Sequence, residues 1–187
     1  MRIVAGEFRG RRLAAPSGLS TRPTTDRARE ALFNKLHHAF PGLLDGARVL
    51  DLFAGTGALG FEALSRGAHT CLFVEMGAEA RGVIRDNIES LGLQGRTKIF
   101  RRDATRLGDA GTIAPFDLLF ADPPYGKGLG ETALGSALSG GWLKPKALCI
   151  VEEASQASLD LPAGFVLLDN LKQGGSIVRI IESPPSA

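Results

Sequence analysis

Short, continuous apolar runs alternate with amphipathic stretches through most of the chain. The runs "ARVLDLF", "TCLFVE", "FDLLFAD" and "ALCIVEE" have the length of strands, and helical patterns such as "AEARGVIRDNIESLG" stand between them. Strands that are apolar on both faces and separated by helices indicate a parallel sheet that helices cover on both sides. The pattern therefore predicts an α/β, Rossmann-like, doubly wound fold.

The two ends of the chain depart from this alternation. Residues 2–13 alternate loosely around a glycine and predict a small hairpin, which a turn-rich loop follows. Near the other end, two strand-like runs flank Gly174 and Gly175, so we expect a second hairpin and an antiparallel last strand. The expected division is an N-terminal hairpin and loop extension over 1–25, a main domain over 26–183, and a disordered tail over 184–187.

A helix is predicted from Asp26, within "DRAREALFNKLHHAF". Thr25 is the expected N-cap, and Asp26 lies in the first turn, where a negative charge is favourable. The helical spacing predicts one apolar face. That face comprises Ala28, Leu32, Leu36 and Ala39.

Composition limits the class of protein. With 187 residues and 44% hydrophobic content, the chain fits one compact domain. It contains neither a run of roughly 18 apolar residues for a membrane helix nor a signal-peptide pattern, so we expect a cytoplasmic protein without membrane partners. Cys71 and Cys149 lie in apolar runs and are predicted to be core residues. The three histidines show no metal-ligand spacing, so no metal is expected.

Positive charge is concentrated at the start of the chain. Residues 1–29 contain seven arginines against Glu7 and Asp26, a net charge of +5, whereas the whole chain has +2 and the remainder therefore −3. A basic end on a near-neutral body favours a polyanionic partner, of which nucleic acid is the commonest. The alternative is a solvated arginine-rich surface.

The turn after the first strand of the main domain, "VLDLFAGTGALG", matches G-x-G-x-x-G through Gly55, Gly57 and Gly60. This spacing is typical of sites for NAD and also for S-adenosylmethionine. Glu75, 20 residues after Gly55, can accept hydrogen bonds from both ribose hydroxyls of either ligand.

Asp51 distinguishes between NAD and S-adenosylmethionine better than Glu75 does. A dinucleotide needs the loop amides for its pyrophosphate, whereas a carboxylate before the loop suits the cationic ammonium and sulfonium groups of S-adenosylmethionine. The alternative is that Asp51 only caps the turn with a local hydrogen bond. Asp103 stands where methyltransferases commonly hold the adenine amino group, with the Ala104 amide at the ring nitrogen; its alternative is a helix N-cap.

The stretch "ADPPYG" follows the fourth strand of the main domain. It is similar to the D-P-P-Y motif of methyltransferases that act on exocyclic amines of bases. The Asp122 carboxylate and the Pro123 carbonyl can accept the two amine protons, and two prolines keep these acceptors rigid because their φ is fixed. Tyr125 would stack on the base. The expected catalytic residues are Asp122, Pro123, Pro124 and Tyr125.

The motifs combine into a family resemblance. Through "GEFRGRRL", "RPTTDRAREALFN", "VLDLFAGTGALGFEALSRGA", "FVE" and "DPPY", the chain resembles the RsmD family of bacterial ribosomal RNA guanine-N2 methyltransferases. The resemblance implies a class I S-adenosylmethionine methyltransferase with a seven-stranded, mostly parallel sheet, helices on both faces and an antiparallel last strand. It further implies methylation of N2 of one guanine of 16S ribosomal RNA, the guanine(966) activity of that family, in an assembled or partly assembled small subunit.

The resemblance also implies roles for single residues. The expected cofactor contacts are Asp51, Phe53, Gly55, Gly57, Glu75, Asp103 and Ala104, with Arg22, Thr24 and Thr25 closing over the methionine end. Arg9, Arg11 and Arg12 are expected to contact RNA phosphates on a hairpin beside the mouth of the active site.

Three other functions stay open at this point. They are an adenine-N6 methyltransferase acting on DNA or RNA, a non-catalytic RNA-binding module on the same fold, and, more distantly, a nicotinamide dehydrogenase. We expect a monomer.

Overall fold

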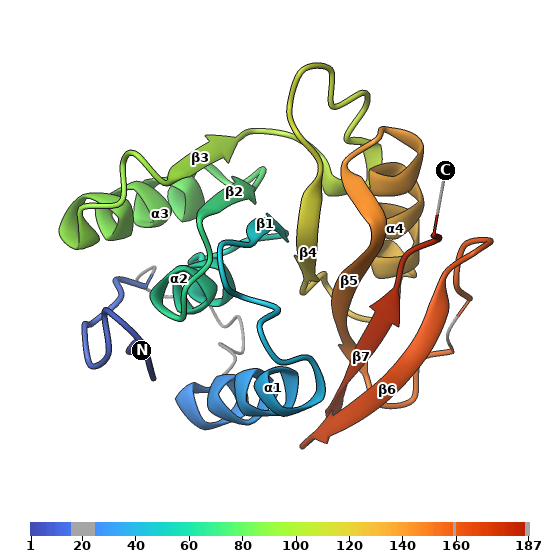
Figure 1. Ribbon diagram of the computed structural model, residues 1–187, viewed down its shortest axis with the longest axis horizontal. Helices are drawn as coiled ribbons and strands as arrows, with labels where there is room; N and C mark the ends of the chain where they lie inside the picture. Colours follow the sequence, from blue (N-terminus) through green and yellow to red (C-terminus); the bar gives the residue numbers. More distant parts are fainter. Residues whose placement is uncertain (16–24, 159, 186–187) are drawn as a thin grey trace.

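The computed structural model describes residues 1–15, 25–158 and 160–185. These residues build one seven-stranded sheet in the order β3-β2-β1-β4-β5-β7-β6. All neighbouring pairs up to β5 are parallel, and β7 is antiparallel to both β5 and β6. The expected mostly parallel sheet with an antiparallel last strand is therefore confirmed (Figure 1). The strands are β1 (Arg48–Leu52), β2 (Thr70–Val74), β3 (Thr97–Phe100), β4 (Phe116–Ala121), β5 (Leu143–Ala154), β6 (Val166–Gln173) and β7 (Ser176–Glu182).

Helices cover both faces of the sheet, as the apolar strands require. One core joins alternate strand residues to helices α1 (Asp26–Ala39), α2 (Ala58–Ser65) and α3 (Ala78–Leu91). The other joins the intervening strand residues to α4 (Leu129–Ser139) and to the segment around the short 3-10 helix η1 (Ala104–Arg106). Cys71 and Cys149 are both buried, which confirms that they are core residues.

Helix α1 begins as predicted, and Leu32 and Leu36 of the predicted apolar face are buried. The Oγ1 atom of Thr25 accepts a hydrogen bond from the Ala28 amide at 3.1 Å and caps the helix. The buried residues are Arg29, Leu32, Phe33 and Leu36. Ala39, the last residue of the helix, is exposed, so its prediction was wrong. Apolar periodicity also could not reveal that Arg29 turns inward to the buried carboxylate of Glu62.

The N-terminal residues form a hairpin with very little strand. A single antiparallel bridge joins Arg2 to Arg12, and Ile3 and Leu13 are buried in the core beneath α1, α2 and α3. The backbone amides of Val4 and Ala5 donate to the buried carboxylate of Glu62 on α2. The extension is thus fastened to the main domain through both apolar burial and hydrogen bonds.

The C-terminal hairpin completes the edge of the sheet. Ser176, the first residue of β7, is paired with Ala154 at the end of β5, so the turn between β6 and β7 lies at the carboxyl edge of the parallel strands. In Figure 1 this turn lies at the same end of the molecule as α1. The carbonyl of Pro184 accepts from the Lys146 amide, which attaches the chain after β7 to the sheet. No helix in residues 1–15, 25–158 and 160–185 has the length and hydropathy to cross a membrane.

Candidate active site

The glycine turn links β1 to α2 at the carboxyl edge of the sheet. Gly55 and Gly57 have φ of 57° and 78°, and a Cβ atom on Gly57 would lie 2.7 Å from the Phe61 ring. Phe53 also has a positive φ, 53°, which is unusual for a bulky residue and typical of functional sites. Glycine is therefore required at Gly57 by both the backbone conformation and the packing of Phe61, and at Gly55 by the conformation.

Asp51 lies under this turn. Its side chain is buried, and Oδ2 accepts a hydrogen bond from the Gly60 amide at 3.0 Å. This is the local hydrogen bond that we expected if Asp51 caps the turn. Burial raises the pKa of Asp51 well above its ordinary value, and the carboxylates of Asp122 and Glu75 raise it further. Three acids thus act on one another at this edge, which makes the site favourable for a cation.

Glu75 follows β2 and braces the turn. Its Oε2 atom accepts from the Gly55 amide at 2.9 Å, and Oε1 accepts from the Gly77 amide at 2.7 Å. Each carboxylate oxygen has a second lone pair, so Glu75 can still accept hydrogen bonds from a ribose.

A cleft of about 450 Å³ opens between the glycine turn and the segment after β4. All seven of its lining residues were predicted from the sequence, and they come from three separate strand ends. The structure thus brings both motifs to one cavity, as the topology of parallel sheets requires. The residues are Phe53, Gly55, Glu75, Asp122, Pro123, Pro124 and Tyr125.

The carboxyl group of Asp122 in the cleft has a raised pKa. Burial, together with the carboxylates of Glu152 and Glu153, raises its pKa to about 7. A carboxyl group with a pKa near neutrality can accept a proton at physiological pH.

Two glutamates at the end of β5 accept hydrogen bonds from the D-P-P-Y segment and the glycine that follows it. The Tyr125 hydroxyl donates to Oε1 of Glu152 at 2.7 Å, and the Ser176 hydroxyl donates to the same oxygen at 2.7 Å. The Gly126 amide donates to Oε1 of Glu153 at 2.9 Å. Burial, followed by the hydrogen bond and charge of Glu152, raises the pKa of Tyr125, so the hydroxyl stays protonated.

Sequence reasoning missed Glu152 and Glu153, although a signal was present. Ligands of a parallel sheet bind beyond the carboxyl ends of its strands, and "ALCIVEE" is one of the predicted strands. The same rule applied to that strand would have selected both glutamates.

The remaining predicted cofactor residues lie apart from the cleft walls. Asp103 is exposed and caps η1, since its Oδ1 accepts from the Thr105 amide at 2.9 Å, while Ala104 is buried. Thr25 caps α1 and lines a neighbouring cavity next to Tyr125. Arg22 and Thr24 lie outside the described residues.

The turn of the hairpin, next to Arg9, is not beside the mouth of the cleft, and for Arg9 that part of the prediction was wrong. Arg12 lies at the base of the hairpin instead, where it pairs with Arg2, whose amide donates to Asp26 at the start of α1. Because α2 runs back from the glycine turn, its last residue, Ser65, lies at the amino ends of the strands. The Glu7 amide donates to the Ser65 carbonyl, and the Glu7 carboxylate pairs with Arg96, directly before β3. The turn of the hairpin therefore lies at the opposite edge of the sheet.

The three arginines also differ from one another. The guanidinium of Arg11 donates to the Ser90 carbonyl on α3, so it joins the hairpin to that helix. All three arginines are exposed, so what sets Arg11 apart is this bond and not burial. Spacing along the sequence could not show this division.

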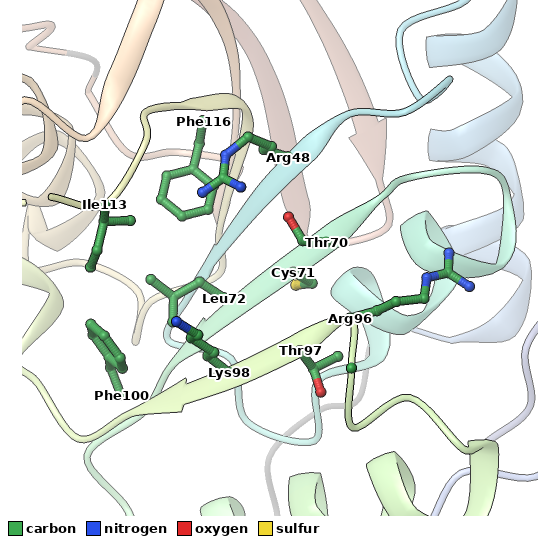
Figure 2. A pocket seen from close by; sticks show the side chains of 11 residues that line it. Arg48, Thr70, Cys71, Leu72, Arg96, Thr97, Lys98, Phe100, Ile113 and Phe116 are labelled. Carbon is green, nitrogen blue, oxygen red and sulfur yellow. The ribbon is translucent and has the colours of Figure 1, made fainter.

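A smaller hollow of about 130 Å³ lies away from all these residues (Figure 2). It occupies the sheet face that carries Leu72 and Phe100, near the start of β1, β2 and β3. The Arg48 guanidinium there donates to the carbonyls of Ala114 and Pro115 and lies 5.0 Å from the ring centroid of Phe116. Arg48 thus serves the local structure, and none of the predicted site residues lines this hollow.

Comparisons with known proteins agree with this geometry. Residues 1–182 match the family model described as "Conserved hypothetical protein 95". Ribosomal RNA small subunit methyltransferase D of Escherichia coli K12 is 39% identical over 169 residues, covering 89% of this chain and 82% of that protein. The protein of the same name from Haemophilus influenzae is 35% identical over 185 residues, covering 98% and 94%.

The fold has a close counterpart among solved structures. The structure of yhhF from Escherichia coli superposes with a TM-score of 0.84 at 34% sequence identity, covering 100% of this chain and 99% of that one. The sheet order and the antiparallel β7 are those of class I methyltransferases. The motifs, their meeting in one cleft and the similarity over nearly the whole length lead to one conclusion: this chain belongs to the RsmD family.

Proposed function

We propose that the protein transfers a methyl group from S-adenosylmethionine to N2 of a guanine in 16S ribosomal RNA, at the position 966 that the family resemblance implies. The single observation that supports it most is the cleft, where the D-P-P-Y segment faces the glycine turn and Glu75. Its relatives are named as methyltransferases of small-subunit ribosomal RNA.

S-adenosylmethionine fits the residues of this site. It supplies an electrophilic methyl group on a cationic sulfonium. The clustered carboxyl groups of Asp51, Glu75 and Asp122 favour a cation, and Gly55 lets the backbone approach closely. Phe53 and Glu75 would hold the adenosine part, while Gly57, Asp103, Ala104 and Thr25 remain proposed contacts.

The chain's own residues can prepare the nucleophile. An exocyclic amine is a weak nucleophile because its lone pair is delocalised into the ring. The Asp122 carboxylate and the Pro123 carbonyl accept hydrogen bonds from the two amine protons, which turns the lone pair toward the methyl group. Asp122, with its pKa near 7, then accepts the proton that the amine loses on forming the new N–C bond.

Tyr125 supports the base and not the proton transfer. Its hydroxyl is fixed by Glu152, so the ring has a defined orientation at the wall of the cleft. Stacking on an aromatic ring contributes about 1 to 3 kcal/mol per base in nucleic-acid sites. The guanine must be unpaired or flipped out of a helix to reach it.

The proposed substrate is the assembled or partly assembled small subunit, bound by a monomer in the cytoplasm, where ribosomal subunits form. Arg9, Arg11 and Arg12 remain proposed RNA contacts. Since the turn of their hairpin lies at the far edge of the sheet, Arg9 would contact phosphates of the particle distant from the target guanine.

The test is transfer of labelled methyl from S-adenosylmethionine to small subunits lacking their native guanine methylation, followed by digestion to nucleosides. Label in N2-methylguanosine is expected. Label in N6-methyladenosine would retain the cleft chemistry and overturn the choice of base. Absence of label from subunits and from free nucleic acid would favour a non-catalytic RNA-binding module.

A further inference from the structure

A second cavity, of about 500 Å³, adjoins the cleft and shares Tyr125 with it. We call it the side groove and define it by Thr25, Arg27, Tyr125, Glu152, Lys172 and Ser176. Its walls come from the start of α1, the end of β5 and the turn between β6 and β7. These segments meet because β7 starts at the carboxyl edge of the sheet, where β5 ends.

The walls of the side groove are held in place by contacts between α1 and the C-terminal hairpin. The Gln173 side-chain amide donates to the Ala28 carbonyl at 2.9 Å, and Lys35 forms an ion pair with Asp169 at 2.7 Å. At the junction with the cleft, Glu152 accepts hydrogen bonds from Tyr125 and Ser176. The groove is therefore preorganised, which reduces the entropic cost of binding a ligand.

The charge of the side groove favours an anion. Arg27 and Lys172 are exposed, and neither forms an ion pair within residues 1–15, 25–158 and 160–185. Glu152 is the single acid among the described lining residues, and both of its hydrogen bonds are made at the junction. Two cations against one acid, beside an aromatic residue, suit a sugar–phosphate chain.

We propose that the side groove binds the backbone of the RNA strand next to the target nucleotide, with Arg27 and Lys172 contacting its phosphates. This inference rests on the proposed function. A base stacked on Tyr125 in the cleft is covalently continuous with its neighbours, and the groove begins at that same residue. Phosphate contacts of this kind fix the register of the strand and not its sequence.

The experiment compares wild type with the double variant Arg27→Gln/Lys172→Gln in binding to unmethylated small subunits over a range of salt concentrations. Each lost phosphate contact on single-stranded RNA lowers the salt slope by about 0.7, so the slope should fall by about 1.4. By the same relation, affinity at 0.1 M salt should fall roughly 10- to 30-fold. Affinity for S-adenosylmethionine and the unfolding temperature should match wild type.

Lys98→Gln/Lys146→Gln is the matched control. It removes two exposed charges from the start of β3 and β5, at the other edge of the sheet, and should bind subunits like wild type. A groove variant with the slope and affinity of this control would overturn the inference. If wild type binds subunits but transfers no methyl, the proposed function fails instead, and the binding comparison still decides the role of the groove.

Discussion

The cleft and the side groove share Tyr125 but differ in the charge and the burial of their lining residues. The cleft gathers the buried or half-buried carboxyl groups of Glu75 and Asp122 above Asp51, whereas the groove presents the exposed cations of Arg27 and Lys172. Buried acids perturb one another and suit chemistry, while exposed cations attract phosphate without changing any reacting atom. Under the proposed function, catalysis and RNA binding would therefore lie in two adjoining cavities of the same surface.

Asp122→Asn should have the largest effect on methyl transfer, and it should impair the chemistry of the cleft without impairing RNA binding. Asparagine keeps the shape but cannot accept the proton of the amine, so kcat should drop about 100-fold or more. Binding of small subunits should stay within about twofold, since the contacts to phosphate are intact. Single-turnover transfer and filter binding measure the two quantities, and equal losses in both would break the separation.

The same variant should also be more stable than wild type at neutral pH. The folded-state pKa of Asp122, about 7, lies above its ordinary value of 3.8. Its contribution to stability is therefore fully present below pH 3.8 and is lost as the pH rises through about 7. Thermal unfolding at pH 5 and pH 8 should show the gain from Asp122→Asn at the higher pH, and a gain at pH 5 alone would contradict this sign.

Tyr125→Ala tests the residue that both regions share. Loss of stacking should reduce kcat/KM roughly 10- to 100-fold. Tyr125→Phe keeps the ring and loses only the hydrogen bond to Glu152, so it should remain within about fivefold of wild type. A phenylalanine variant as impaired as the alanine variant would show that the hydroxyl, and not the ring, is what matters.

Glu152→Gln should change the pH profile more than the maximal rate. The rate should rise with pH as Asp122 ionises, with its midpoint near 7 in wild type. Removing the Glu152 charge removes one cause of that raised pKa, so the midpoint should move to lower pH while the amide still accepts from Tyr125. The midpoint of the pH–rate profile is the measurement, and an unmoved midpoint would show that the Glu152 charge does not raise the pKa of Asp122.

The smallest effect should come from the hairpin. Arg9→Gln should weaken binding to whole small subunits a few-fold and leave binding of a short RNA around the target guanine unchanged, because the hairpin turn, next to Arg9, lies far from the cleft. The groove variant should weaken both. Equal losses on the short RNA for the two variants would contradict the assignment of distinct roles.

The cleft could be predicted from the sequence because its residues occur in local motifs at strand ends. Gly55 and Asp122 each follow a recognisable apolar strand, and the topology brings such ends together. The side groove could not, since Arg27 and Lys172 are 145 residues apart and come together through contacts between α1 and the C-terminal hairpin, such as that of Gln173. Arg29 illustrates the same limit, because its burial depends on Glu62 from another helix.

The most direct test of this division is the dependence of the single-turnover transfer rate on subunit concentration for wild type and Arg27→Gln/Lys172→Gln. The account predicts the same maximal rate for both, reached by the variant only at subunit concentrations roughly 10- to 30-fold higher. A lower maximal rate with an unchanged half-saturating concentration would contradict it, because the groove would then act on the chemistry and not on RNA binding.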